Sequence, residues 1–179
     1  KISFTGSVAT GKLVAAAAAP DLKRVTLELG GNDPAIVLPD VDVARTAKRL
    51  FWGAFENCGQ VCSAIKRVYV PESLYESMVA QLADMARGVK VGNGLDEDSQ
   101  LGPVNNRPQF ERVQELVEDA RQAGARLVTG GQRLGDRGYF YAPTIVADLQ
   151  DGTRLVDEEQ FGPVLPVVSY TDVDAAIAR

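Results

Sequence analysis

The sequence contains no histidine, and this absence removes several kinds of active site at once. Without an imidazole there is no Ser-His or Cys-His nucleophile pair, no histidine acid or base, and no histidine metal ligand. The only cysteines, Cys58 and Cys62, are too few to hold a structural zinc ion, so we predict no bound metal. Proton transfer must then use a carboxylate, Lys, Tyr, Cys or water. So few cysteines in 179 residues are typical of reduced thiols, which predicts a cytoplasmic protein.

An excess of positive charge and long apolar runs are also lacking. Lys and Arg number 19 against 24 Asp and Glu, which gives a net charge of -5. Because binding of a phosphate backbone needs a basic face, we expect no nucleic-acid partner. No apolar run has the length of a membrane-spanning helix, so we expect no membrane partner. The composition, 45% hydrophobic and 24% charged, is that of a globular chain of one domain or two small ones.

Apolar residues recur with strand and helix periods in alternating segments along the chain. Strands are expected at residues 2–5, 24–29, 34–38, 67–70, 125–129, 139–146 and 164–170. Helices are expected at residues 7–18, from Asp40 or Asp42 to about 55, after Ser73, at 110–123, and from Asp172 onward. This alternation predicts an α/β fold with three layers, in which helices flank a largely parallel sheet.

The segment from Gly6 to Lys12 follows an expected strand and opens an expected helix. Backbone N–H groups at the start of a helix attract phosphate, so Gly6, Ser7 and Gly11 are candidate contacts to a nucleotide. The pattern differs from a P-loop, because Leu13 stands where a Ser or Thr must bind Mg²⁺. A P-loop-like nucleotide-binding enzyme and a plain glycine turn both stay open as alternatives.

Glu28 stands on an expected strand beside Val25 and Leu27, and Gly30-Gly31 follows it. A carboxylate among apolar neighbours is a candidate general base. The glycines would let a ligand approach the backbone closely. The alternative is a structural Glu28 that faces solvent from the polar side of a half-buried strand.

Cys62 ends the run Gly59-Gln60-Val61-Cys62, where we expect a loop, or a loop that merges into a helix turn. A thiolate at the start of a helix is stabilised by the helix N-terminus. It is also the side-chain nucleophile that needs a histidine least. Cys62 is therefore a candidate nucleophile, with an inert buried cysteine as the alternative. We assign Cys58 to packing.

Glu158 and Glu159 precede Gln160-Phe161-Gly162-Pro163, where an aromatic residue meets a Gly-Pro turn. In one interpretation a carboxylate binds a pair of ligand hydroxyls and the Phe161 ring packs against a flat heterocycle. In the other, the segment is a surface turn at the end of a helix.

In this order the four segments resemble the aldehyde dehydrogenase superfamily, and the resemblance extends over essentially the whole chain. The motifs that carry it are Phe4-Thr5-Gly6-Ser7, Leu27-Glu28-Leu29-Gly30-Gly31-Asn32, Gly59-Gln60-Val61-Cys62, Glu158-Glu159-Gln160-Phe161-Gly162-Pro163, Arg137-Gly138-Tyr139-Phe140 and Pro143-Thr144. The resemblance implies a central-to-C-terminal part of a longer oxidoreductase. Residues 1–31 would be the C-terminal tail of its NAD(P)-binding domain, and residues 32–179 a catalytic domain truncated at its C-terminus.

The resemblance also implies roles for individual residues. Cys62 would attack an aldehyde to form a thiohemiacetal, hydride would pass to NAD or NADP, and Glu28 would activate water to hydrolyse the resulting thioester. The implied cofactor contacts are Gly6, Ser7, Gly11, Leu29, Gly30, Glu159 and Phe161. The chain departs from the family at Arg112, where a Lys near the cofactor is common.

For the full-length protein the resemblance implies a small aldehyde substrate and a homodimer or homotetramer. It implies little activity for the 179-residue chain by itself, since half of the cofactor site would be missing. A non-catalytic α/β interaction module with an inert Cys62 is the remaining alternative, and the reactivity of that thiol distinguishes the two.

Overall fold

The computed structural model describes residues 1–178, and the chain divides into two compact units, Lys1–Gly31 and Asn32–Arg179. In the first unit, strand β1 (Ile2–Thr5) leads into helix α1 (Val8–Ala18), the short 3-10 helix η1 (Ala19–Asp21) and strand β2 (Val25–Glu28). The helix returns the chain to the starting end of β1, so the two strands pair in parallel, with Thr5 opposite Glu28.

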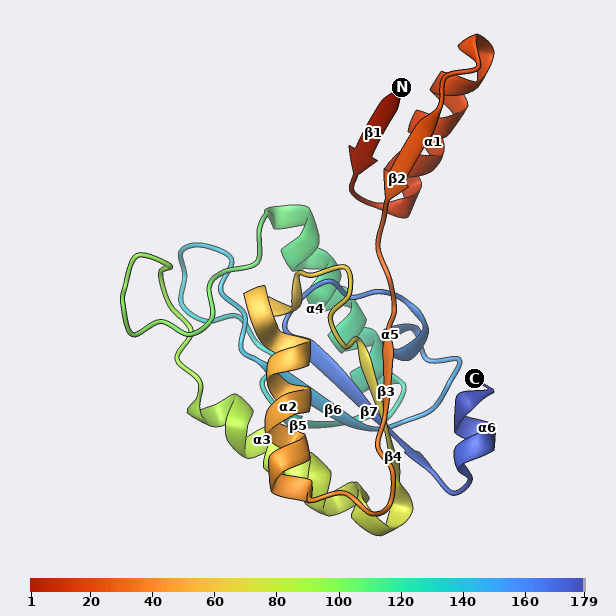
Figure 1. The fold of residues 1–179 in the computed structure, drawn as a ribbon. Helices are drawn as coiled ribbons and strands as arrows, with labels where there is room; N and C mark the ends of the chain where they lie inside the picture. The colour runs from red at the N-terminus through yellow and green to blue at the C-terminus, as the bar shows by residue number, and fades with distance from the viewer. Residues whose placement is uncertain (179) are drawn as a thin grey trace. The chain divides into compact units, whose positions relative to one another are not determined.

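The second unit is built around a five-stranded sheet (Figure 1). Its strands are β3 (Pro34–Ile36), β4 (Arg67–Pro71), β5 (Arg126–Thr129), β6 (Thr144–Leu149) and β7 (Val164–Tyr170). They lie in the order β3-β4-β7-β6-β5, and every neighbouring pair is parallel except β5 and β6. Its helices are α2 (Val43–Phe55), α3 (Tyr75–Gly88), α4 (Arg107–Gln122), α5 (Arg154–Asp157) and α6 (Val173–Ile177), with 3-10 turns η2 (Glu56–Gly59) and η3 (Glu72–Leu74).

Alternation along the strands divides the core of the second unit between the two faces of the sheet. Val68 and Val70 of β4 pack in one cluster with residues of α2 and α3. Tyr69, between them, packs in a second cluster with residues of α4, α5 and α6. Successive strand residues point to opposite faces, so each face is covered by its own helices. The structure thus confirms a three-layer α/β fold with a largely parallel sheet.

The structure settles one expected helix start and corrects two others. Of the two candidate caps for α2, the structure selects Asp42, whose carboxylate accepts a hydrogen bond from the Arg45 N–H at 2.7 Å. Ser73 caps no helix, because η3 intervenes and α3 begins at Tyr75 without a side-chain cap. Helix α4 begins earlier than expected, since the Asn106 side chain caps it.

The expected extended segment 139–146 is also shifted along the chain, because β6 begins at Thr144 and continues to Leu149. No helix within residues 1–178 combines the length and the apolar character needed to cross a membrane.

Candidate active site

In the first unit the candidate phosphate contacts gather at the start of α1. Ser7 is the N-cap, and its hydroxyl accepts a hydrogen bond from the Thr10 N–H at 3.2 Å. The Gly6 N–H donates to the Glu28 carbonyl at 3.0 Å and the Gly11 N–H to the Ser7 carbonyl at 2.9 Å, so both serve the fold. The N–H groups in the first turn of α1 are the groups of this unit that could bind an anion, because they lack acceptors within the helix.

The structure also brings Gly11 and Leu29 together in this unit. A Cβ on Gly11 would lie 2.6 Å from the Leu29 Cδ2, so the glycine lets the segment after β2 pack directly on α1. Leu29 and Gly30 are both half-buried. A larger residue at position 11 would displace the Leu29 side chain, so the glycine contributes to packing independently of any ligand.

Glu28 ends β2 with an exposed side chain. Val25 and Leu27 are half-buried on the alternate positions, and they point to the opposite face of the strand. The apolar surroundings that the sequence predicts for this carboxylate are therefore not supplied by β2 itself. Its exposure leaves the carboxylate open to water within this unit.

In the second unit, three chain segments far apart in sequence meet at one edge of the sheet. Strands β3, β4 and β7 are neighbours and parallel, so the residues just before each strand lie at the same edge. We call these segments the N-terminal edge cluster; they are residues 32–33, 61–66 and 159–163. The structure thus brings Cys62 together with Glu159 and Phe161.

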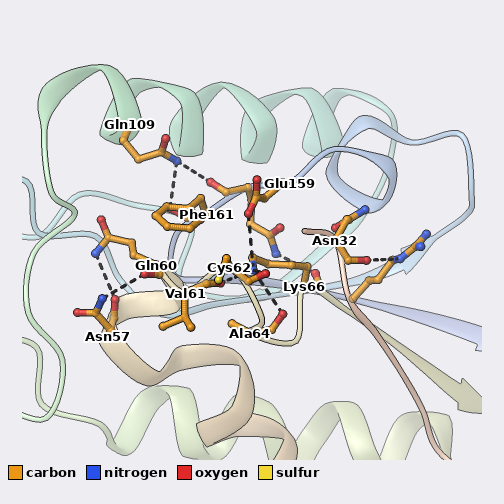
Figure 2. A network of polar contacts seen from close by, with 12 residues as sticks. Asn32, Asn57, Gln60, Val61, Cys62, Ala64, Lys66, Gln109, Glu159 and Phe161 are labelled. Atoms are coloured by element: carbon orange, nitrogen blue, oxygen red, sulfur yellow. Dashed lines mark hydrogen bonds and ion pairs between the residues drawn. The ribbon is translucent and has the colours of Figure 1, made fainter. Parts of the chain in front are cut away.

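Cys62 lies in a turn between η2 and β4, and its side chain is exposed. No helix begins there, so the expected support from a helix N-terminus is wrong. The nearby positive charge is instead Lys66, whose Nζ donates to the Val61 carbonyl at 2.6 Å (Figure 2). The Lys66 ammonium and a Cys62 thiolate attract one another electrostatically, which raises the pKa of Lys66 against the larger, opposite effect of burial.

Cys62 is exposed, whereas Cys58 is buried. It is 1% exposed and belongs to the core cluster below α4. Burial raises the pKa of its thiol to about 12. The assignment of Cys58 to packing is therefore confirmed.

This contrast predicts selective labelling. Iodoacetamide added to the folded chain is expected to modify Cys62, and to modify Cys58 more than about a hundredfold more slowly, because burial raises the pKa of the Cys58 thiol and closes it to the reagent, while Cys62 is exposed. Peptide mapping by mass spectrometry after timed alkylation measures both rates, with the urea-unfolded chain as control. Equal rates at the two cysteines in the folded chain would contradict the prediction.

The backbone around the candidate nucleophile is unusual. Asn57, Cys58 and Gly59 have φ values of 49°, 61° and 72°, and Phe161 has a φ of 44°. Left-handed conformations of residues other than glycine cost free energy and cluster at functional sites. Here they accompany a close approach of two segments, because a Cβ on Gly59 would collide with the carbonyl oxygen of Gly162.

Replacing Gly59 with alanine is expected to destabilise the chain for two reasons. The left-handed backbone alone costs about 1–2 kcal/mol, and the collision with Gly162 adds about 1–3 kcal/mol. Gly152 is a matched control, since its φ is 91° but its Cβ position is open. Urea unfolding of Gly59→Ala and Gly152→Ala measures the loss of unfolding free energy in each variant. Equal losses would contradict a steric collision between residue 59 and the Gly162 carbonyl.

The two adjacent carboxylates before β7 are used differently. Glu158 Oε1 accepts from Arg154 Nε at 2.7 Å and Glu158 Oε2 from Arg112 Nη2 at 3.2 Å, and these guanidinium groups lower the pKa of Glu158. Glu159 is 26% exposed, with Oε1 lying 3.8 Å from Lys66 Nζ. The tertiary structure therefore holds Glu158 between two guanidinium groups and places Glu159 beside Lys66.

Helix α4 fixes the backbone that carries Glu159 and Phe161. Arg112 Nη2 donates to the Glu159 carbonyl at 3.1 Å. Gln109 Nε2 donates to the Gln160 carbonyl at 2.7 Å and to the Phe161 carbonyl at 3.0 Å, which holds the left-handed turn (Figure 2). Arg112, the position at which the chain departs from the resemblance, thus positions this segment.

Sequence reasoning missed Lys66 and Gln109. Both are polar residues at ordinary positions, one before a strand and one in the first turns of a helix. No local signal distinguishes them from surface residues, because their partners lie in other segments of the chain.

Other features of the described residues do not coincide with the candidate site. A cavity of about 490 Å³ is lined by residues that include Tyr75, Asp148 and Asp151, none of them predicted as site residues. Within residues 1–178, no group of three or more His, Cys, Asp or Glu side chains could hold a metal ion.

Comparison with known proteins places the chain in a family. The model of the aldehyde dehydrogenase family matches residues 1–179. This chain belongs to the aldehyde dehydrogenase family. A probable aldehyde dehydrogenase from Pseudomonas sp. is 46% identical over 179 residues, which are 100% of this chain and 37% of that protein. The resemblance of the ordered motifs to this family is therefore confirmed.

Solved aldehyde dehydrogenase structures share the fold. The NAD⁺ complex of the Bacillus cereus enzyme gives a TM-score of 0.96 at 40% identity, covering 99% of this chain and 36% of that one. A variant of aldehyde dehydrogenase C from Pseudomonas syringae, complexed with NAD⁺ and octanal, gives 0.94 at 41% identity, covering 98% and 37%. This aldehyde dehydrogenase chain spans a little over a third of the length of these relatives.

Proposed function

We propose that the whole protein oxidises an aldehyde to a carboxylic acid and transfers hydride to NAD⁺ or NADP⁺. The observation that carries this proposal is the exposed Cys62 thiol beside Lys66 and Glu159, at one edge of the sheet, in a chain without histidine. Membership of the family supports it, as does the occurrence of NAD⁺ and octanal in the complex of a relative.

The residues present are suited to a dinucleotide. We propose that the first turn of α1, capped by Ser7, binds the pyrophosphate through its unpaired N–H groups. Gly6 and Gly11 would lie in this pyrophosphate-binding turn and helix start, with Leu29 and Gly30 bordering the nicotinamide. Glu159 would bind ribose hydroxyls, with Phe161 packing nearby. Bound NAD(P)⁺ supplies the hydride acceptor.

On this proposal residues 1–31 belong to the NAD(P)-binding domain and residues 32–179 to the catalytic domain. Since the chain spans 37% of the Pseudomonas relative, we propose that the 179 residues by themselves have little activity. A homodimer or homotetramer and a cytoplasmic location also stay predictions. Membership of the family argues against the P-loop-like alternative, and the exposed Leu13 remains unsuited to Mg²⁺.

In the first half of the reaction Cys62 acts as the nucleophile. Its thiolate attacks the aldehyde carbon, a C–S bond forms, and the carbonyl π electrons move to the oxygen. The Cys62 backbone N–H is a donor for this oxyanion. Departure of hydride from the same carbon re-forms the C=O bond and leaves a thioester on Cys62.

In the second half Glu28 acts as the general base. Its carboxylate accepts a proton from water while the water oxygen attacks the thioester carbon. The C–S bond then breaks, the carboxylic acid leaves, and the Cys62 thiolate is restored. The exposure of Glu28 within its unit is consistent with access of water to the carboxylate.

The direct test is catalysis by the whole protein. Incubation with NAD⁺ or NADP⁺ and linear aldehydes of increasing length, octanal among them, is expected to yield reduced cofactor and carboxylic acid in equal amounts. Absorbance of the reduced cofactor and chromatography of the acid measure the two products. Absence of both products with either cofactor, in a folded protein, would contradict the proposed function.

A further inference from the structure

Lys66 is the most deeply buried charged residue of the N-terminal edge cluster. Its side chain is 1% exposed, in the last position before β4. A buried ammonium is strongly destabilising unless hydrogen bonds and opposite charges compensate it. Burial lowers the pKa of Lys66, and the negative charges of Glu159, Asp33 and Cys62 oppose that shift in this order. Burial is the larger effect, so the pKa of Lys66 is lowered overall, and the three negative groups partly compensate the cost of burying the ammonium.

The ammonium is bound to the turn that carries the candidate nucleophile. Lys66 Nζ donates to the carbonyl of Val61 at 2.6 Å, and lies 3.4 Å from the carbonyls of Cys62 and Ala64. The Ala64 N–H donates to the Val61 carbonyl at 3.1 Å and closes the turn. An ammonium has three donors, and the three backbone carbonyls within 3.4 Å of Nζ belong to one short segment. Lys66 thus fixes the backbone of Cys62 from the interior while the thiol stays exposed.

The same ammonium faces the segment before β7. Its Nζ lies 3.8 Å from Glu159 Oε1 and 5.8 Å from the centre of the Phe161 ring (Figure 2). At this distance the buried Lys66 ammonium attracts the Glu159 carboxylate and orients it, but does not cover it. Glu159 remains 26% exposed, so part of its carboxylate stays accessible to hydroxyls of a ligand.

The backbone of Lys66 joins the same three segments. Its N–H donates to the Asp33 carbonyl before β3 at 3.0 Å, and its carbonyl accepts from Gln160 Nε2 at 2.8 Å. Gln160 Nε2 also donates to the Val164 carbonyl at 2.7 Å. The backbone of Lys66 therefore links the segments that precede β3, β4 and β7, which fixes the point from which its side chain extends.

We propose that Lys66 is a positioning residue that fixes the Cys62 turn and orients the Glu159 carboxylate toward the cofactor. This inference rests on the proposed dehydrogenase function, because it assigns Lys66 to the same site. Lys66 touches neither reacting atom; it acts through the carbonyls of the turn and through Glu159.

The test replaces Lys66 with methionine, which keeps an unbranched side chain and removes the charge. Lys48→Met, at an exposed lysine of α2, is the control. Lys66→Met removes the desolvation cost of the ammonium, and its partner Glu159 is 26% exposed and therefore not left as a buried unpaired charge, so the variant is expected to fold. In the whole protein the KM for NAD⁺ is expected to rise about tenfold through loss of charge orientation. The kcat is expected to fall about ten- to a hundredfold through misplacement of the nucleophile.

A double-mutant cycle separates positioning from general loss of stability. If Lys66 acts on the cofactor through Glu159, Lys66→Met raises the KM for NAD⁺ no further once Glu159→Gln is present. If the KM for NAD⁺ of the double variant rises by the full combined effect of Lys66→Met and Glu159→Gln, this half of the proposal is overturned. The thermal unfolding midpoint of each variant reports stability separately, and Lys66→Arg, which keeps the charge, is expected to recover most of the KM.

Alkylation of Cys62 tests the other half without requiring catalysis. Lys66→Met is expected to slow the reaction of Cys62 with iodoacetamide about three- to tenfold, because the charge nearest the thiolate is removed. A rate within twofold of the original would overturn the role at Cys62. Unfolding of both Lys66→Met and Lys66→Arg would assign Lys66 to the fold and also overturn the proposal. If the original protein oxidises no aldehyde, the dehydrogenase proposal fails, while the alkylation rates still decide whether Lys66 controls Cys62.

Discussion

The whole protein carrying Cys62→Ala is expected to lose aldehyde oxidation by roughly 10³- to 10⁶-fold, the range seen when a covalent nucleophile is removed. Alanine cannot form the C–S bond, so neither the thiohemiacetal nor the thioester can arise. Because Cys62 is exposed in its turn, its replacement disturbs no core packing and stability should change little. Initial rates of formation of reduced cofactor, beside a thermal unfolding curve, measure both quantities.

Cys58→Ala is the matched control for this experiment, since it makes the same chemical change four residues earlier. Cys58 is 1% exposed, so its truncation should lower the free energy of unfolding by about 1 kcal/mol while the rate stays within a few-fold. Retention of more than a hundredth of the original rate by Cys62→Ala would contradict the assignment of the nucleophile. Loss of activity in Cys58→Ala alone would indicate the wrong cysteine.

Glu28→Gln is expected to arrest the reaction after the hydride has left. The amide cannot accept a proton from water, so hydrolysis of the thioester should slow about 10²- to 10⁴-fold. Acylation of Cys62 does not require this proton transfer. Each active site should therefore form one equivalent of reduced cofactor rapidly and then turn over very slowly. Stopped-flow absorbance gives the burst amplitude, and intact-protein mass spectrometry shows the acyl group on Cys62.

Glu159→Gln serves as the contrast among the carboxylates. It should raise the KM for the cofactor without accumulation of an acyl-enzyme, because Glu159 is assigned to the ribose and not to water. A Glu28→Gln protein that turns over at the original rate would remove Glu28 from the mechanism. One that shows no burst at all would place Glu28 in acylation instead of hydrolysis.

Several features of the fold and of the candidate site could be predicted from local sequence. Alternation of Val25 and Leu27 with Glu28 gave the correct faces of β2, because strand periodicity needs only neighbouring residues. The run before Cys62 predicted a glycine-containing turn, and the structure has Gly59 at a φ of 72°. The order of the four motifs sufficed for the family, since it depends on residue identity and spacing alone.

Local sequence was less informative where two signals compete. Asn106 precedes Pro108, and this pair starts α4 earlier than its apolar periodicity indicates. Of the two predictions for the segment before Cys62, a loop or a loop merging into a helix turn, the structure shows no helix that begins at Cys62, and the nearby positive charge comes from Lys66. In each case one polar side chain, Asn106 or Lys66, makes a contact that the pattern of the surrounding residues does not indicate.

By itself, then, the sequence determined the α/β class, the absence of imidazole chemistry and the candidates Cys62, Glu28 and Glu159. Only the tertiary structure decided that the chain before β3, β4 and β7 meets at one edge of a sheet. It also decided that Lys66 lies buried among those segments. The physical reason is that strand order and register depend on contacts between residues far apart in sequence. No periodicity or spacing records which segments will become neighbours, or which lysine they will enclose.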